Sequence, residues 1–220
     1  MKQDLPKPDS SLSDLVYAQL RSLLREGELS PGQRVSESNI CERFQVSRTP
    51  AREAIHRLLN EGFLVLPPSG KPEVAEIDIP SAEEIYDMRE AVECLAVRLA
   101  ARKATTRDLI ELSDILDEQA AGLSSETDFL DINDRFHACI YRISGNRHLQ
   151  RTAGILLVSA GMIRGTTHGK YDFNSWSLSD HREIYQAIEN GDAAAGEEAM
   201  RRHIRRGRFQ RIKLLTGTGG

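Results

Sequence analysis

The sequence predicts a mainly α-helical protein, with an N-terminal winged helix-turn-helix followed by a C-terminal all-α bundle of six helices. Apolar residues recur at helical spacing along most of the chain, and strand-like stretches are confined to the region before Ser81. A length of 220 residues allows one or two domains. We expect a flexible tail at 1–10, a winged-helix domain at 11–79, a helical domain at 80–215 and a disordered tail at 216–220.

The first domain is predicted to contain three helices and a β-hairpin. Leucine and valine residues at helical spacing mark a first helix that ends near Gly27. Ser36 is the expected N-cap of a short second helix, and Thr49 followed by Pro50 is the expected start of the third. A turn rich in proline joins the two short strands of the hairpin, expected at residues 63–66 and 75–79.

The rest of the chain predicts helices only. Ser81 and Glu84 have the spacing of a capping box at the start of the first. No repeat period is found, which favours a bundle over a solenoid. The expected helices span residues 81–103, 106–121, 127–143, 147–164, 180–190 and 193–214.

Basic residues gather on the third predicted helix, although the chain as a whole has a formal net charge of −4. Arg48, Arg52 and His56 are spaced four residues apart and therefore share one helix face. Such a face could enter the major groove of DNA, where arginine binds guanine or phosphate. A merely solvated face is the alternative, but the order of the helices and Lys71 near the hairpin tip favour DNA.

The segments "RVSESNICERFQV" and "SRTPAREAIHRLLNEGFL" resemble the signature of the GntR family of bacterial transcriptional regulators. The resemblance covers residues 12–79. It implies DNA contacts by Ser47, Arg48, Thr49 and Arg52, and a wing tip at Ser69 and Gly70 that reaches the minor groove. Ser38 departs from relatives that carry a basic residue at its position, which puts that phosphate contact in doubt.

Polar residues interrupt the apolar stripes of three helices in the second domain. Asn133 and His137 fall within one stripe, His181 begins another, and His203 lies among the apolar residues of the last helix. A buried polar group needs a partner. Separate structural roles would satisfy each histidine singly, but a shared divalent transition metal, similar to Zn, Ni or Mn, is the simplest common partner.

The second domain resembles the FCD effector domain of the FadR subfamily. The segments "MREAVECLAVRLAARKAT", "NDRFHACIYRISGNRHL" and "DHREIYQAIENGDAAAGEEAMRRHI" carry the resemblance. It implies a metal held at Asn133, His137, His181 and His203, although aspartate is commoner than asparagine at the first position, so binding should be weaker.

The same resemblance implies a small carboxylate effector beside the metal. Arg89 matches an arginine that helps to bind it, with a pair to Glu93 or Glu90 on the same helix as the alternative. Arg164 is a weaker candidate for the same pocket.

These observations together predict a ligand-responsive transcriptional regulator that binds DNA as a homodimer. One short helix reads too few base pairs, so two copies on a palindromic operator are expected. A metal sensor, with the metal as the signal, is the alternative.

A metal-dependent enzyme is remote, because Asp134 and Glu183 lie off the ligand stripes and no positioned carboxylate base is evident. We expect no membrane segment and a cytoplasmic location. The arginine-rich segment at residues 201–213 is expected to form a solvated helix face. Binding of an anion or of DNA to this face is the alternative.

Overall fold

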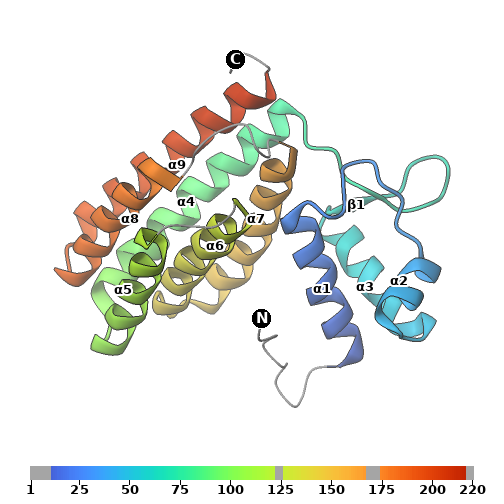
Figure 1. Cartoon of the computed structure of the whole chain (residues 1–220), viewed down its shortest axis with the longest axis horizontal. Coiled ribbons are helices and arrows are strands. Elements are labelled where there is room, and N and C mark those ends of the chain that lie inside the picture. Colours follow the sequence, from blue (N-terminus) through green and yellow to red (C-terminus); the bar gives the residue numbers. More distant parts are fainter. Residues whose placement is uncertain (1–10, 122–125, 167–173, 217–220) are drawn as a thin grey trace. The chain divides into compact units, whose positions relative to one another are not determined.

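A computed structural model describes residues 11–121, 126–166 and 174–216, apart from the side chains of 126–128, 164–166 and 174–175. The chain divides into two compact units, Met1–Ile77 and Asp78–Gly220. Figure 1 follows the order of their helices and strands along the chain.

The first unit is a winged helix-turn-helix, as the sequence predicts. Its elements are α1 (Leu12–Glu26), α2 (Glu37–Phe44), α3 (Arg48–Asn60), β1 (Leu64–Val65) and β2 (Glu73–Val74). α1 and α3 pack together and bury the apolar faces that the spacing indicates, with Leu20, Leu24 and Leu58 almost fully enclosed. β1 and β2 pair antiparallel, with Leu64 opposite Val74.

Two local details of this unit differ from the prediction. α3 begins at Arg48 with Ser47 as its N-cap, so Thr49 lies inside the first turn instead of capping it. The second strand covers Glu73–Val74 and not residues 75–79. Asp78 explains the second error, because its side chain accepts a hydrogen bond from the backbone N–H of Ser81 and starts a helix there.

The second unit is the predicted helical bundle. Its elements are α4 (Ile79–Lys103), α5 (Thr106–Ala120), α6 (Glu126–Ile143), α7 (Arg147–Thr166), α8 (Asn174–Glu189) and α9 (Ala193–Leu215). α8 starts six residues earlier than expected, so His181 lies within the helix and does not open it. The fully enclosed Ser177 shows that this extra stretch belongs to the packed interior.

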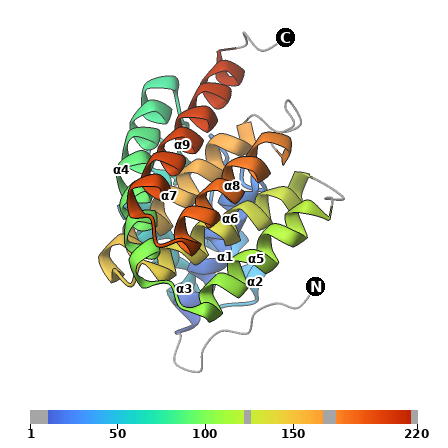
Figure 2. The ribbon, with the colours of Figure 1, turned by 90° about the vertical axis from the view of Figure 1, so that its left-hand side faces the viewer.

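α4 is the central helix of the bundle and contacts α6, α7, α8 and α9. Its long antiparallel contact with α9 is visible in Figure 2, where the two helices lie side by side. Gly196 allows this close approach, since a Cβ atom there would lie 2.7 Å from Cγ1 of Val97. The inner face of α4 therefore packs against α6, α8 and α9.

Candidate functional site

Three histidines from three helices meet inside the second unit. His137 comes from α6, His181 from α8 and His203 from α9, and all three are buried. Their ring centroids are 5.5 Å (His137–His181), 5.3 Å (His137–His203) and 4.8 Å (His181–His203) apart. One nitrogen from each ring lies within 4.8 Å of the others. The sequence pattern that singled out these residues thus corresponds to one cluster.

The Nδ1 atoms of His181 and His203 are hydrogen-bonded, whereas that of His137 lies close to a carboxylate without a hydrogen bond among the described residues. The Nδ1–H of His181 donates to Oε1 of Gln119 (3.0 Å), and that of His203 donates to Oδ2 of Asp180 (3.3 Å). Nδ1 of His137 lies 2.5 Å from Oε2 of Glu93. A hydrogen bond at Nδ1 fixes the tautomer and leaves the Nε2 lone pair as the ligand atom. The Nε2 atoms of His181 and His203 are therefore the ones left to ligate, and His137 has both ring nitrogens without a hydrogen bond among the described residues.

The Nε2 atoms provide the test of whether a metal fits. Those of His137 and His181 are buried with no hydrogen-bond partner among the described residues, which is a costly state for a polar atom. Nitrogens bound to one zinc ion at 2.0–2.1 Å would lie about 3.4 Å apart, and one nitrogen from each ring already lies within 4.8 Å of the others. The cluster fits a divalent metal with nitrogen ligands.

The electrostatic surroundings favour the neutral form of His181 and His203. Burial lowers the pKa of His181 well below its usual value, and the nearby His203 and His137 lower it further. Burial also lowers the pKa of His203, although the hydrogen bond to Asp180 acts in the opposite direction. Metal ligation requires neutral imidazole. The site is therefore prepared to bind a cation without first losing protons at these two rings.

Arg89 is buried beside the cluster and is paired. Its Nε donates to Oε1 of Glu93 at 2.7 Å, and the side chains of the two residues are 7% and 1% exposed. Although burial raises the pKa of Glu93, Arg89 and His137 hold it well below its usual range. The intrahelical pair, considered from sequence as the alternative to effector binding, is thus formed, and it links Arg89 to His137 through one carboxylate.

The other candidates around the metal are placed less directly. Asn133 is buried on α6, one turn before His137, and its Nδ2 donates to Oδ1 of Asp134 at 3.2 Å. That bond leaves the amide oxygen of Asn133 as its possible ligand atom. Arg164 belongs to α7, but its side chain lies outside the described residues.

Sequence reasoning missed the three partners of the histidines. Gln119 follows Leu112, Ile115 and Leu116 at helical spacing on the buried face of α5. The same rule that singled out the histidines, a polar residue on an apolar stripe, would have found it. From the sequence, Glu93 is expected only as a partner of Arg89, and no role is expected for Asp180.

The residues proposed to contact DNA lie on the surface of the first unit. Those of α3 and its N-cap are exposed, and so are those between β1 and β2, where Gly70 adopts a φ of 71°. Arg52 is engaged in a two-point ion pair with Glu37 of α2. The exposed candidates are Ser47, Arg48, Thr49, Arg52, His56, Ser69, Gly70 and Lys71.

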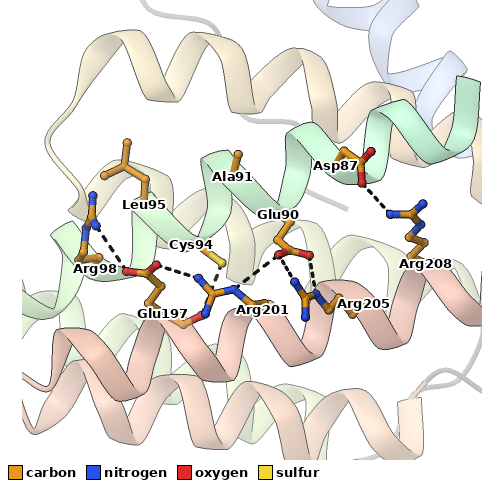
Figure 3. Close-up of a pocket in the computed structure, with 10 residues that line it drawn as sticks. All are labelled: Asp87, Glu90, Ala91, Cys94, Leu95, Arg98, Glu197, Arg201, Arg205 and Arg208. Atoms are coloured by element: carbon orange, nitrogen blue, oxygen red, sulfur yellow. Dashed lines mark hydrogen bonds and ion pairs between the residues drawn. The ribbon is translucent and has the colours of Figure 1, made fainter.

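The arginines of α9 do not form a free basic face. An open trough of about 670 Å³ lies between α4 and α9. Figure 3 shows arginine side chains that line it and contact acidic side chains of both helices. Arg205 binds both oxygens of Glu90 at 2.8 Å, and Arg208 binds Asp87. Outside the trough, Arg206 pairs with Asp180. These ion pairs favour the solvated-face interpretation over a site for an anion or DNA.

Comparison with known families agrees with this arrangement. The model for bacterial regulatory proteins of the gntR family matches residues 12–69, and the FCD domain model matches residues 84–206, which is more than half of the chain. The chain belongs to the GntR family. Its combination of a GntR DNA-binding domain with an FCD domain is consistent with the FadR-like subfamily.

Relatives of this GntR protein extend over nearly its whole length. It is 30% identical to the HTH-type transcriptional regulator McbR of Escherichia coli K12, over 93% of each chain. The HTH-type transcriptional repressor RspR of the same organism is 26% identical over 90% of this chain and 87% of its own. A solved structure of E. coli McbR/YncC superposes with a TM-score of 0.82, at 26% identity, over 96% of this chain and all of the other.

These matches establish the general class of the GntR protein. Its domains and relatives are transcription regulators and not enzymes, and the fold is that of a DNA-binding regulator with an effector domain. Among the described residues, none of the helices has the length and apolar character needed to cross a bilayer.

Proposed function

We propose that this regulator responds to a ligand held in its FCD domain, where a divalent transition metal and a small carboxylate bind together. The observation that carries the proposal is the convergence of three buried histidines. His181 and His203 are hydrogen-bonded at Nδ1, and Nδ1 of His137 lies beside the carboxylate of Glu93. An arrangement held so firmly from outside is typical of metal sites, because outer hydrogen bonds orient the ligands.

His137, His181 and His203 would supply nitrogen ligands, and Asn133 an amide oxygen. When bound, such a metal would act as a Lewis acid that attracts an anionic oxygen donor. Nitrogen ligands favour Zn, Ni or similar ions over Mg or Ca. The uncharged oxygen of Asn133 contributes less attraction than a carboxylate would, which makes an anionic effector a more important part of the filled site.

Arg89 remains the candidate for the carboxylate of the effector, with Arg164 as the weaker one. The pair between Arg89 and Glu93 means that an effector would have to share or replace Glu93 as the partner of Arg89. Such an exchange would also disturb His137, which contacts the same carboxylate. Effector and metal binding would then be coupled.

For DNA recognition, we propose that α3 enters the major groove and the hairpin approaches the minor groove. A homodimer on a palindromic operator follows, because a single α3 reads too little sequence. Half-exposed apolar residues on α4 and α7 of the second unit offer a surface for the second copy, including Met88, Leu95 and Leu156. Because a transcription regulator acts on chromosomal DNA, we also propose a cytoplasmic location.

The test begins with purified protein and measures metal by elemental analysis and small molecules by mass spectrometry. We expect bound transition metal in the wild type and its loss in His181→Ala, with His148→Ala, a surface histidine of α7, as the control. Unchanged metal content in His181→Ala would remove this residue from the site, and a wild type that binds no metal would refute the metal-dependent function.

A second measurement separates effector sensing from metal sensing. Protein stripped with a chelator is titrated with Zn²⁺ or Ni²⁺ while binding to a DNA duplex selected from a random pool is followed. A metal sensor changes its DNA affinity with metal alone, whereas an effector-responsive regulator needs an organic acid in addition.

A further inference from the structure

An acidic residue of α2 contacts the proposed DNA-binding face of α3. Glu37 is the first residue of α2, and Arg52 of α3 binds it through two nitrogens. Nε of Arg52 donates to Oε1 of Glu37 at 2.7 Å, and Nη2 donates to Oε2 at 3.2 Å. A carboxylate at this place would be expected to repel phosphate, so its presence needs an explanation other than general attraction to DNA.

The geometry of the pair decides which part of Arg52 remains available. The contact is side-on, since it uses Nε and one N–H of Nη2. Nη1 and the second N–H of Nη2 form the outer end of the guanidinium. That end has the two parallel donors that bind O6 and N7 of guanine. A guanidinium oriented by this side-on contact already has its outer N–H groups positioned to donate to a base.

The surroundings strengthen this interpretation. The hydrogen bond from Arg52 lowers the pKa of Glu37, and the charges of Arg48 and His56 lower it further, so the carboxylate is ionised and electrostatically tied to the basic face. The side chains of Arg52 and Glu37 are 58% and 33% exposed. An ion pair this exposed is weak. Its main effect is therefore on orientation and not on stability.

We propose that Glu37 is a positioning residue that makes Arg52 a reader of guanine and keeps it from acting as a general phosphate-binding arginine. The inference rests on the proposed role of α3 in the major groove. It predicts that Glu37 raises affinity for the correct sequence and lowers affinity for other sequences. These two effects have opposite signs, which neither simple charge repulsion nor a structural role would produce.

The experiment compares wild type with Glu37→Gln on two duplexes of about 30 base pairs, one selected from a random pool by the wild-type protein and one of random sequence. Affinities are measured by fluorescence anisotropy over a range of salt concentrations. We expect Glu37→Gln to bind the selected duplex about fivefold more weakly, equivalent to about 1 kcal/mol. We expect it to bind the random duplex about threefold more tightly, with a log–log salt slope steeper by about 0.9, because Arg52 gains a phosphate contact.

Controls separate the possible causes. Glu42→Gln removes a carboxylate from the same helix and should change neither affinity more than twofold. In an Arg52→Ala background, Glu37→Gln should likewise have no effect beyond twofold. A circular dichroism melt checks that each variant is folded, and Glu37→Ala repeats the test if Glu37→Gln is not.

The outcomes are distinct. If Glu37→Gln tightens binding to both duplexes, the carboxylate only repels phosphate, and if it weakens both, its role is structural; either result overturns the inference. An effect that persists in the Arg52→Ala background also overturns it. If Arg52→Ala alone leaves binding to the selected duplex unchanged, the proposed reading face is wrong. If Arg52→Ala weakens binding but Glu37→Gln behaves as wild type, only the inference about Glu37 is wrong.

Discussion

Replacing Glu93 by glutamine should destabilise the FCD domain even in the absence of metal and effector. The substitution keeps the shape of the side chain but removes the charge that Arg89 faces at 2.7 Å and His137 at 2.5 Å. Arg89 cannot adapt by releasing its proton, because a guanidinium is too basic to be deprotonated in a protein. The variant would therefore contain a buried, uncompensated positive charge.

The size of the effect follows from this burial. Removing one partner of a buried ion pair costs about 3–5 kcal/mol, and the amide of glutamine can still accept one hydrogen bond, so about 3 kcal/mol is expected. In a unit of about 140 residues, each kcal/mol lowers the melting temperature by about 2–4 °C. Thermal unfolding of metal-free Glu93→Gln should therefore occur about 6–12 °C below wild type.

Glu118→Gln is a matched control for this experiment. Glu118 binds Arg135 at 2.8 Å, but the two side chains are 51% and 45% exposed. An exposed pair contributes about 0–1 kcal/mol, so this variant should melt within about 3 °C of wild type. The assay is circular dichroism at 222 nm in the presence of a chelator. Equal melting temperatures for Glu93→Gln and Glu118→Gln would refute the reasoning about the buried pair.

Three further predictions concern the metal, the pH and DNA. Asn133→Asp should bind Zn²⁺ or Ni²⁺ about tenfold more tightly in calorimetry, because it adds a charged oxygen ligand; equal affinity would place Asn133 outside the metal's reach. Metal-free protein should lose stability as the pH falls below about 6.5, because imidazoles in the unfolded chain take up protons that the buried His181 and His203 do not. The loss should be at most about 1.4 kcal/mol per pH unit for each histidine, and urea unfolding of His181→Phe should show a shallower pH dependence. Lys71→Ala should weaken binding to any duplex and reduce its salt slope by about 1; a loss restricted to one sequence would contradict a phosphate contact.

Helix periodicity was the most informative property of the sequence. It placed the helices of both units, and it singled out His137, His181 and His203 because a polar residue on an apolar stripe must find a partner in the interior. That reasoning works without knowledge of the tertiary contacts. It also applies to Gln119, whose position on α5 has the same pattern.

The remaining errors and omissions depend on contacts that periodicity does not show. Residues 75–79 alternate like a strand, yet the side chain of Asp78 caps a helix instead. Glu93 serves both Arg89 on its own helix and His137 on α6, and only the second contact required the packed structure. The pair between Glu37 and Arg52 joins two helices across 15 residues, so no local pattern indicates it.

The position of α4 along the chain has a mechanical consequence. β2 ends at Val74 and α4 begins at Ile79, which leaves a tether of four residues between the hairpin and the helix that carries Arg89 and Glu93. Arg89 is ten residues from the start of α4, or about 15 Å along a stiff rod. If the proposed effector replaced Glu93 as the partner of Arg89 and moved this helix, its stiffness would carry the movement to its first residue. A displacement of α4 within the bundle would thus reach the segment that follows β2 without requiring any other loop to move.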